Sequence, residues 1–595
     1  MNKEQKTEYL RHSLAHLLAA AVMELWPDAL RTIGPAVDNG FYYDFDFSGN
    51  ADLRGIDANE RGRGISDKDL TRIEERMRAL VKKWNKFSHR EVSMDEAREV
   101  FAGNPYKLEL IDEIEKKGEK ITLYKSGSFE DLCRGGHVES AKEMQASGYK
   151  LSHLAGAYWR GDEKNKMLTR IYGLAFPTKE ELVAYETMLE EAKKRDHRKL
   201  GKELEIFTFA DEIGAGLPLW LPNGAIIRHE LEEWARKTEL KWGYKHIVTP
   251  HITKKNLFEI SGHLPFYKND LYSPIDIEGE EYYLRPMNCP FAHMVYKSKN
   301  RSYRDLTLRL AEYGQVYRFE RSGTLHGLMR ARGFCQNDAH IYVKPEDAVK
   351  EFVDVFKMHE YYYKTLGISD WWVVLGVRDA GNLRVKYHGD DEMWEKAEKL
   401  TRQAIEKAGV KYTVEEGGAA HYGPKADIYI SSVIGKEYAI GTVQLDLYMP
   451  NRFDLKYIDK DGEGKMPYVI HRAPLGSHER MIGFLLEHFA GAFPFWLSPV
   501  QVRVLPITDT QKKYAGEITD ALLEASFRAE LDDASESLGK KIRDTKVQKI
   551  PYFLVIGDEE LRNGTVMLES RDGKIGAKSL DELLTYFKKI EQEKK

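Results

Sequence analysis

Many short, strand-like runs lie between about residues 201 and 497, and turns rather than helices separate most of them. Parallel strands need a long crossover for each connection, so a region with few alternations of strand and helix favours an antiparallel sheet flanked by helices. At 595 residues the chain is too long for one core, because domains usually have about 100–200 residues. We therefore expect a multidomain α+β protein with its antiparallel core at 201–497.

The flanking segments have different patterns. Residues 9–26 carry apolar side chains at helical spacing and GFYYDFDF (40–47) is typical of a strand, so we expect one α+β domain at 1–177. Thr178 and Glu181 form a capping-box pattern before a charged stretch, which predicts a linker helix at 178–200. VQVRVLPI and PYFLVIG alternate with helical segments further on, which predicts a small α/β domain at 498–595.

The composition is that of a folded protein. The 90 Lys and Arg nearly balance the 95 Asp and Glu, and 42% of residues are hydrophobic, so net charge neither indicates nor excludes nucleic-acid binding. Three cysteines (Cys133, Cys289, Cys335) are too few for a disulfide framework. Neither a cleavable signal pattern nor a run of 18 apolar residues occurs. We expect a cytoplasmic protein that has no membrane partner.

The string VYRFERSGTLHGLMRARGFCQNDAH, residues 316–340, is rich in arginine and glycine and brings an aromatic ring at Phe334. Guanidinium groups make bidentate, charge-assisted bonds to phosphate oxygens, and an aromatic face can stack on a base. An isolated run of arginines is more often a solvated loop, so the string by itself leaves both interpretations open.

Two histidines and a later Cys-His pair mark the N-terminal segment. His12 and His16 are four residues apart on the predicted helix and therefore share one face. Cys133 and His137 repeat that spacing. Histidines on the polar face of a helix commonly have no catalytic role, and four such side chains could also bind zinc tetrahedrally.

Motifs in three places resemble those of class II aminoacyl-tRNA synthetases. They are the predicted helix 223–241 leading to Pro250, Arg318-Phe319-Glu320 followed by Arg332-Gly333-Phe334, and Gly476-Ser477-His478-Glu479-Arg480 before an apolar helix. MNCP (287–290), QNDAH (336–340), HYGPK (421–425), GTVQLD (441–446) and VIHRAPLG (469–476) resemble the threonyl members of the class. The resemblance implies activation of L-threonine with ATP, transfer to tRNA(Thr), and a homodimer paired through the first motif.

The resemblance also assigns the synthetic site. It implies Arg318 at the α-phosphate and the amino-acid carboxylate, Arg330 and Arg480 towards the γ-phosphate, and Glu320 and Phe334 at adenine, with magnesium accompanying ATP. Gln444 joins the ATP site, Lys425 adds positive charge near the reacting phosphate, and Gln336, Asp338 and Tyr422 hold the amino acid. Ala439 stands where the family usually has glutamine, so one polar contact to the adenylate is missing or replaced.

One zinc ion per subunit, held by Cys289, His340 and His471, is a further implication. Three protein ligands leave an open coordination position. An apolar pocket separates threonine poorly from valine, whereas a site that must engage the hydroxyl rejects valine. After MNCP the family usually has Gly-His, but here Phe291-Ala292 precedes His293.

The N-terminal segment resembles the editing domain shared by threonyl- and alanyl-tRNA synthetases. Serine lacks only a methyl group, a difference worth about 1–3 kcal/mol, so a second, hydrolytic sieve for Ser-tRNA(Thr) is expected. By the resemblance its residues are His12, His16, Lys107, Asp131, Cys133 and His137, and we expect a metal-free site. The family usually has CRGPH, with proline in place of Gly136, and usually begins with a ubiquitin-like domain that we do not find here.

Residues 498–595 resemble the anticodon-binding domain of the histidyl, glycyl, threonyl and prolyl enzymes. Arg543 and Glu560 fall where anticodon contacts are expected, whereas Ser535, Ser537 and Glu569 replace the usual asparagine, lysine and arginine. Unpaired bases are recognised by stacking and edge hydrogen bonds, so these replacements change the available contacts.

Two alternatives remain. A synthetase of the same class for proline or serine would not need Cys289, His340 and His471 together, and an RNA-binding regulator derived from a synthetase would not need Arg318 and Arg480.

Overall fold

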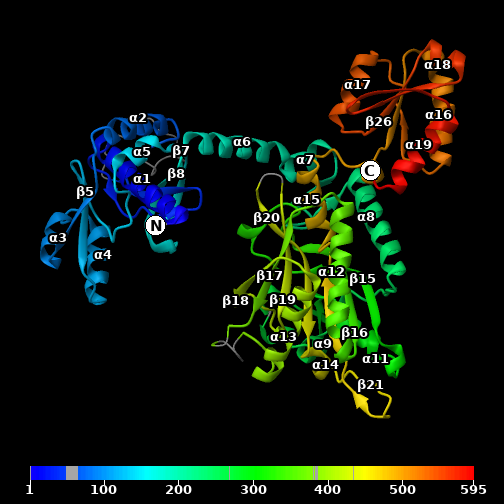
Figure 1. Ribbon diagram of the computed structural model, residues 1–595, viewed down its shortest axis with the longest axis horizontal. Helices are drawn as coiled ribbons and strands as arrows, with labels where there is room; N and C mark the ends of the chain where they lie inside the picture. Colours follow the sequence, from blue (N-terminus) through cyan, green and yellow to red (C-terminus); the bar gives the residue numbers. More distant parts are fainter. Residues whose placement is uncertain (1, 49–64, 267, 380, 382–385, 433–434) are drawn as a thin grey trace. The chain divides into compact units, whose positions relative to one another are not determined.

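The computed structural model describes residues 2–48, 65–266, 268–379, 381, 386–432 and 435–595 (Figure 1). Contacts divide the chain into two compact units, Met1–Glu190 and Glu191–Lys595. Among the described residues, no helix is long and apolar enough to cross a membrane.

The first unit is built on a five-stranded sheet with strand order β1-β3-β8-β7 and β2 paired to β3. The long helix α1 packs its apolar side chains (Leu14, Leu17, Leu18) into the core of this sheet. A separate antiparallel sheet, β4-β5-β6, carries the segment that leads to Cys133. The elements are α1 (Lys3–Leu25), β1 (Leu30–Arg31), β2 (Ala36–Val37), β3 (Gly40–Asp46), α2 (Asp69–Val81), β4 (Ser88–Val92), α3 (Met94–Val100), α4 (Pro105–Lys116), β5 (Ile121–Ser126), β6 (Phe129–Leu132), α5 (Ala141–Ala146), β7 (Gly148–Tyr158) and β8 (Met167–Phe176).

The predicted linker segment contains two helices rather than one. α6 (Lys179–Arg195) starts where the Thr178 side chain accepts a hydrogen bond from the Glu181 amide, as the capping pattern predicts. Asp196 then interrupts the helix, because its carboxylate accepts the Arg198 amide and begins α7 (His197–Glu203).

An eight-stranded sheet forms the centre of the second unit, with strand order β11-β15-β16-β23-β20-β19-β17-β18. All its pairs are antiparallel except the edge pairs β11·β15 and β17·β18, in agreement with the sequence-based expectation. Its strands are β11 (Lys245–His246), β15 (Leu308–Tyr317), β16 (Gly333–Val343), β17 (Trp371–Val377), β18 (Tyr412–Glu416), β19 (Lys425–Ser431), β20 (Glu437–Asp446) and β23 (Tyr468–Ala473). The helices and short strands around it are β9 (Phe207–Thr208), β10 (Leu219–Trp220), α8 (Pro222–Lys241), β12 (Ile252–Lys254), α9 (Lys255–Ile260), α10 (His263–Phe266), β13 (Ile275–Ile277), β14 (Glu280–Leu284), α11 (Cys289–Lys297), α12 (Ala348–Thr365), α13 (Asp391–Ala408), α14 (Met449–Arg452), β21 (Tyr457–Ile458), β22 (Gly464–Lys465) and α15 (His478–His488).

The two faces of this sheet have different roles. Alternate side chains of its central strands, such as Ile341, Ile428 and Val443, pack against α8, α12, α13 and α15 in the main core. Because successive residues of a strand point to opposite faces, the residues between them point the other way. Gln336, Asp338 and His340 on β16 lie on that second face, so alternation along the strands places the polar side chains together.

The C-terminal part of the second unit is a mixed five-stranded sheet with order β25-β24-β26-β27-β28. β24 is parallel to both β25 and β26, and β27 and β28 continue the sheet antiparallel. Arg528 links it to α8 through an ion pair with Glu230 of 2.7 Å. The elements are β24 (Val502–Pro506), α16 (Lys512–Glu524), β25 (Ala529–Leu531), α17 (Leu538–Val547), β26 (Tyr552–Ile556), α18 (Asp558–Asn563), β27 (Val566–Ser570), β28 (Gly573–Lys578) and α19 (Leu580–Gln592).

A buried ion pair ties α8 to the two central strands. Arg472 of β23 lies 2.8 Å from Glu239 of α8, and both side chains are fully buried. The Asn337 amide of β16 donates to the same Glu239 carboxylate at 2.8 Å, and His246 lies 3.1 Å from its other oxygen. Burial alone would raise the pKa of Glu239, but the Arg472 charge together with the His246 and Asn337 hydrogen bonds lowers it, so the carboxylate remains ionised.

We predict that Arg472→Met lowers the free energy of unfolding of the second unit by about 3–5 kcal/mol, because Glu239 would remain buried without its counter-charge. Urea denaturation measures the loss. The double variant Glu239→Gln/Arg472→Met should recover part of it. Lys237→Met, which removes an exposed pair with Glu233 on the same helix, should cost less than about 1 kcal/mol. A parental unfolding midpoint for Arg472→Met would contradict this account.

Candidate functional sites

A cavity of about 680 Å³ opens over the polar face of the large sheet. Strands β16, β19 and β20, the loop before β16 and the start of α15 contribute its walls. The cavity brings together eight residues that the resemblance places at ATP and threonine: Arg318, Glu320, Arg330, Phe334, Gln336, Lys425, Gln444 and Arg480. Its size suits a nucleotide-sized ligand.

The arginines of this cavity are held by backbone and ring contacts. The Arg318 guanidinium donates to the Pro286 carbonyl at 3.2 Å and lies 5.2 Å from the centre of the Phe334 ring. Arg480 donates to the carbonyls of Met329 (3.3 Å) and Ala439 (3.0 Å). Burial, together with the nearby Arg318 charge, lowers the pKa of Arg480. Such a concentration of positive charge in a partly desolvated cavity favours a polyanionic ligand.

Two cavity residues pair with carboxylates. Arg330 forms an ion pair of 2.9 Å with Glu320, and Lys425 forms one of 2.7 Å with Asp427. The cavity also contains Ala439, whose backbone carbonyl accepts a hydrogen bond from Arg480 and whose side chain offers no polar group.

The amino-acid end lies beside this cavity. Asp338 is half-buried and accepts a hydrogen bond from the Asn288 amide at 3.0 Å, and desolvation raises its pKa. Tyr422 donates to the Gln444 carbonyl oxygen. Asn288, next to Cys289, therefore links the predicted amino-acid contacts to the predicted zinc ligands.

Cys289, His340 and His471 meet at one point although they come from three elements. Pairing of β16 with β23 sets His340 directly opposite His471, and the thiol comes from the first residue of α11. Their ligand atoms all lie within 4.8 Å of one another, and all three residues are buried. Burial lowers the pKa of His340 well below its usual value, so its imidazole is neutral, the form that binds metals. One sulfur and two nitrogen donors fit zinc.

Asp446 and His293 stand next to this set. His471 Nε2 is 2.9 Å from Asp446 Oδ2, a carboxylate contact of the kind that orients metal-binding imidazoles. His293, displaced by Phe291-Ala292, is fully buried, with Nδ1 3.0 Å from the Tyr342 hydroxyl. Its ring centre is 5.9 Å from that of His340, so the unusual histidine packs against the set without joining its three ligands.

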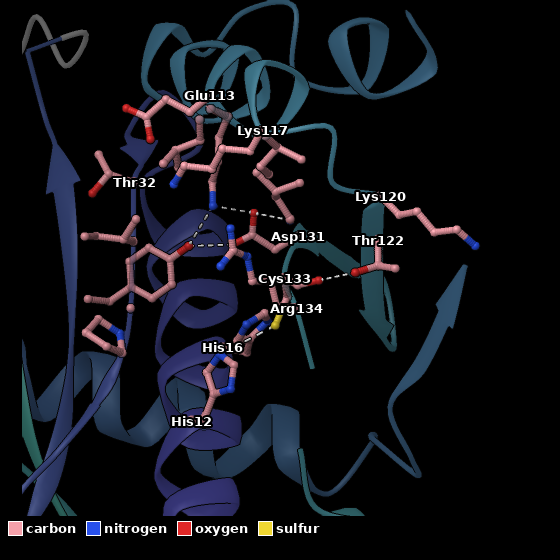
Figure 2. Close-up of a pocket in the computed structure, with 18 residues that line it drawn as sticks. His12, His16, Thr32, Glu113, Lys117, Lys120, Thr122, Asp131, Cys133 and Arg134 are labelled. Carbon is pink, nitrogen blue, oxygen red and sulfur yellow. Dashed lines mark hydrogen bonds and ion pairs between the residues drawn. The ribbon is translucent and has the colours of Figure 1, made fainter. Parts of the chain in front are cut away.

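The predicted editing residues also converge, in the first unit, and Figure 2 shows four of them: His12, His16, Asp131 and Cys133. α1 presents His12 and His16, and the turn after β6 brings Cys133 and His137 to them, so that the ligand atoms of all four lie within 4.8 Å. Cys133 Sγ is 3.2 Å from His137 Nε2 and 3.6 Å from His12 Nε2. Burial raises the pKa of the Cys133 thiol to about 11 and lowers that of His16 to about 3.

Hydrogen bonds fix the tautomers of two of these rings. His12 Nδ1 lies 3.2 Å from the Gly136 carbonyl, which can only accept, so this nitrogen carries the proton. His137 Nδ1 lies 3.2 Å from Ser13 Oγ, whose own proton goes to the Tyr9 carbonyl, so His137 Nδ1 also donates. The Nε2 lone pairs of both rings therefore face the Cys133 sulfur, which lies 3.2 Å from His137 Nε2 and 3.6 Å from His12 Nε2.

A buried charge cluster closes the far side of the editing pocket. Lys107 Nζ is 2.8 Å from Asp131, and both side chains are almost fully buried. The sequence analysis missed two further partners of Asp131: Arg31, at 3.2 Å, and the Tyr43 hydroxyl, which donates to it. Tyr43 belongs to the GFYYDFDF run, from which only a strand was predicted. No motif in the sequence marked Arg31 as a functional residue.

Gly136 shapes the turn between Cys133 and His137. Its φ of +85° lies in the left-handed region, which proline cannot adopt because its ring holds φ near about −65°. The turn therefore differs from that of a CRGPH sequence while still delivering His137.

The predicted anticodon residues lie on helices of the C-terminal part. Arg543 is exposed on α17, 3.7 Å from Asp544. The Glu560 carboxylate accepts the Gly557 amide at 2.9 Å and caps α18. Ser537 caps α17, and Glu569 lies 3.8 Å from Lys574.

Family models match three parts of the chain. The class II tRNA synthetase core domain (G, H, P, S and T) matches residues 267–489, and the anticodon binding domain matches 501–590. The threonyl and alanyl tRNA synthetase second additional domain matches 121–172.

Similar proteins cover almost the whole chain. A threonine–tRNA ligase of a Sulfurihydrogenibium species is 46% identical over 99% of this chain and 90% of its own length. That of Deinococcus radiodurans is 45% identical over 95% of this chain and 85% of its own. A crystal structure of the RNA binding domain of threonyl-tRNA synthetase from Cryptosporidium parvum is 36% identical with a TM-score of 0.64, covering 66% of this chain and 98% of that one.

Proposed function

This chain belongs to the threonine–tRNA ligases, and on that premise we propose how its residues carry out synthesis and editing. The observation that carries the proposal is the adjacency of an arginine-lined cavity to the buried set of Cys289, His340 and His471. The cavity accommodates ATP with its magnesium, and the buried set selects the amino acid.

Activation joins the threonine carboxylate to the α-phosphate and releases diphosphate. Alignment and compensation of developing negative charge are the main requirements of such an in-line displacement. Arg318 meets the α-phosphate, and Arg480 and Arg330 meet the γ-phosphate. Lys425 adds charge near the reacting phosphorus, and Phe334 stacks on adenine.

Selection of threonine depends on its hydroxyl. Zinc, if held by Cys289, His340 and His471, would keep coordination open to the substrate and would bind the amino and hydroxyl groups of threonine, which valine cannot match. Asp338 accepts a hydrogen bond from the threonine hydroxyl, and Gln336 and Tyr422 orient the amino acid. Asp446 keeps the His471 ring in place through its contact with Nε2.

Editing removes serine from tRNA(Thr) in the first unit. The four side chains His12, His16, Cys133 and His137 position the ester and an attacking water, and the neutral imidazoles are the groups that can accept a proton from this water. Lys107 supplies positive charge for the oxyanion that forms, and Asp131 positions Lys107. We propose that this site works without metal and that the protein acts in the cytoplasm, where its three free cysteines remain thiols.

Arg543 and Glu560 are proposed to contact the anticodon of tRNA(Thr). The exposed Arg543 is available for such a contact, and the Ser537 and Glu569 surroundings differ from those usual in the family.

We predict about one zinc ion per chain and its loss in Cys289→Ala, because thiolate ligation contributes to both affinity and geometry. The parent should catalyse ATP–diphosphate exchange with threonine, weakly with serine and not with proline, and Cys289→Ala should not. Metal analysis checks the stoichiometry independently of activity. Cys335→Ala, which removes the cysteine outside both sets, should retain zinc. Two ions per chain, one of them lost in Cys133→Ala, would contradict the metal-free editing site.

Synthesis and editing should be separable. His12→Ala/His16→Ala should leave threonine activation within a few-fold of the parent while Ser-tRNA accumulates, because the two reactions use different side chains. Arg480→Ala should stop activation while hydrolysis of preformed Ser-tRNA continues. His153→Ala, an exposed histidine of the same unit, is the matched control. Parental deacylation by the double histidine variant would refute the editing assignment.

A homodimer paired through the first class II motif is also proposed. At the end of α8 and in the segment that follows, three apolar side chains remain exposed: Leu240 (59%), Val248 (88%) and Ile252 (39%). These side chains offer apolar area that a second copy could cover, and paired copies are the commonest oligomers.

We predict that the 68.6 kDa chain sediments at twice this mass at micromolar concentration. Val248→Asp should shift the equilibrium towards the monomer by placing a charge in the interface. Val183→Asp, which changes another exposed valine (59%) on α6, should leave the sedimentation unchanged. A parent that sediments as a stable monomer would rule out the dimer.

A further inference from the structure

His197 is a fully buried histidine at the first position of α7, distant in sequence from every residue of the ATP cavity. It lies where three elements meet: α7, the C-terminal end of α15, and the loop 326–330 that leads into β16. This loop contains Arg330, and α15 begins with the segment that carries Arg480.

The hydrogen bonds of His197 assign a separate task to each ring nitrogen. The Leu328 amide, which can only donate, points to His197 Nε2 at 3.3 Å, so Nε2 is the acceptor. Nδ1 must then carry the proton, which it donates to Glu487 Oε1 at 2.8 Å. Glu487 is held in turn by the Tyr438 hydroxyl at 2.9 Å on its other oxygen. The ring thus has one defined orientation: Glu487 of α15 fixes it, and the Leu328 amide of the loop donates to it.

The next residues of the loop meet the ATP cavity. The Met329 carbonyl accepts a hydrogen bond from Arg480 Nε at 3.3 Å, and Arg330 pairs with Glu320 at 2.9 Å. Leu328, Met329 and Arg330 are consecutive, so the amide held by His197 lies one residue from the carbonyl that orients Arg480.

Packing confirms how closely the loop fits this corner. A Cβ added to Gly327 would lie 2.3 Å from His197 Nε2, and one added to Gly483 of α15 would lie 3.3 Å from the Leu328 Cβ. Any side chain at 327 would therefore displace the loop from the ring.

We propose that His197 is a positioning residue for ATP: by accepting the Leu328 amide, it holds loop 326–330 where Met329 orients Arg480 and where Arg330 reaches the nucleotide. The inference rests on the ATP-binding roles proposed above for Arg330 and Arg480. His197 itself does not line the cavity, so it acts through the loop.

Two substitutions separate the tasks of the ring. His197→Gln places an amide oxygen near the position of Nε2 and can still accept the Leu328 amide. His197→Asn places its amide nitrogen near Nδ1 and can still donate to Glu487, but it leaves the Leu328 amide without an acceptor. A residue needed only to satisfy Glu487 would therefore be rescued by Asn, and a residue needed for the loop would be rescued by Gln.

The test is threonine-dependent ATP–diphosphate exchange with the full-length protein. An unsatisfied buried amide corresponds to about a tenfold effect, so we expect His197→Asn to raise the KM for ATP by about tenfold with little change in the KM for threonine. His197→Gln should remain within about twofold of the parent. Hydrogen exchange at the Leu328 amide should accelerate in the Asn variant only. Lys199→Gln, an exposed change on the same helix, is the control.

Equal KM values for ATP in the two variants, or rescue by Asn instead of Gln, would overturn the proposal. If His197→Asn does not fold, Gly327→Ala is measured in its place. Fast hydrogen exchange at the Leu328 amide of Gly327→Ala, together with a parental KM for ATP, would also overturn the proposal. Arg480→Ala distinguishes the two levels of the argument. A parental KM for ATP in that variant would refute the proposed ATP site. The expected result, loss of ATP–diphosphate exchange, leaves the comparison of the two His197 variants as an independent test.

Discussion

The buried ion pair between Arg472 and Glu239 is the constraint on which the second unit depends. A charge in the core is tolerated only with its partner and its hydrogen bonds in place, so α8, β16 and β23 must keep their relative positions. Since neighbouring strand residues face opposite sides, fixing Arg472 and Asn337 on the helix side also fixes His471, Gln336 and Asp338 on the cavity side. A structural contact on one face thereby determines the geometry of the site on the other.

The first unit also contains a buried charge cluster, and this cluster lies within the editing site itself. Asp131 is surrounded by Lys107, Arg31 and Tyr43, and the Lys107 and Arg31 charges keep the pKa of this carboxyl low despite burial. The cluster holds two cations for one anion, so positive charge remains beside the neutral His16. Neutral imidazoles next to a fixed positive charge are suited to hydrolysis of an ester, because the charge stabilises an oxyanion and the imidazoles can accept protons.

The ATP cavity and the editing site therefore differ in how their positive charges are balanced. In the ATP cavity Arg330 pairs with Glu320, whereas the partners of Arg318 and Arg480 are the backbone carbonyls of Pro286, Met329 and Ala439, so the charge of these two arginines is left for the ligand. Carbonyls fix the direction of a guanidinium without neutralising it. His197 acts on the same arginines indirectly, because it holds the loop backbone that supplies the Met329 carbonyl to Arg480.

The sequence by itself determined the antiparallel core, the face-sharing of His12 and His16, and the motif residues that meet in the cavity and at Cys289, because strand alternation, helical spacing and family motifs are local properties. It did not determine that Tyr43 and Arg31 complete the Asp131 cluster, that Asp446 contacts His471, or that His197 supports a loop 131 residues away. It predicted one linker helix where Asp196 begins a second. These features were decided by the tertiary structure, because a contact between distant segments depends on how whole elements pack, and neither partner carries a local signal of the other.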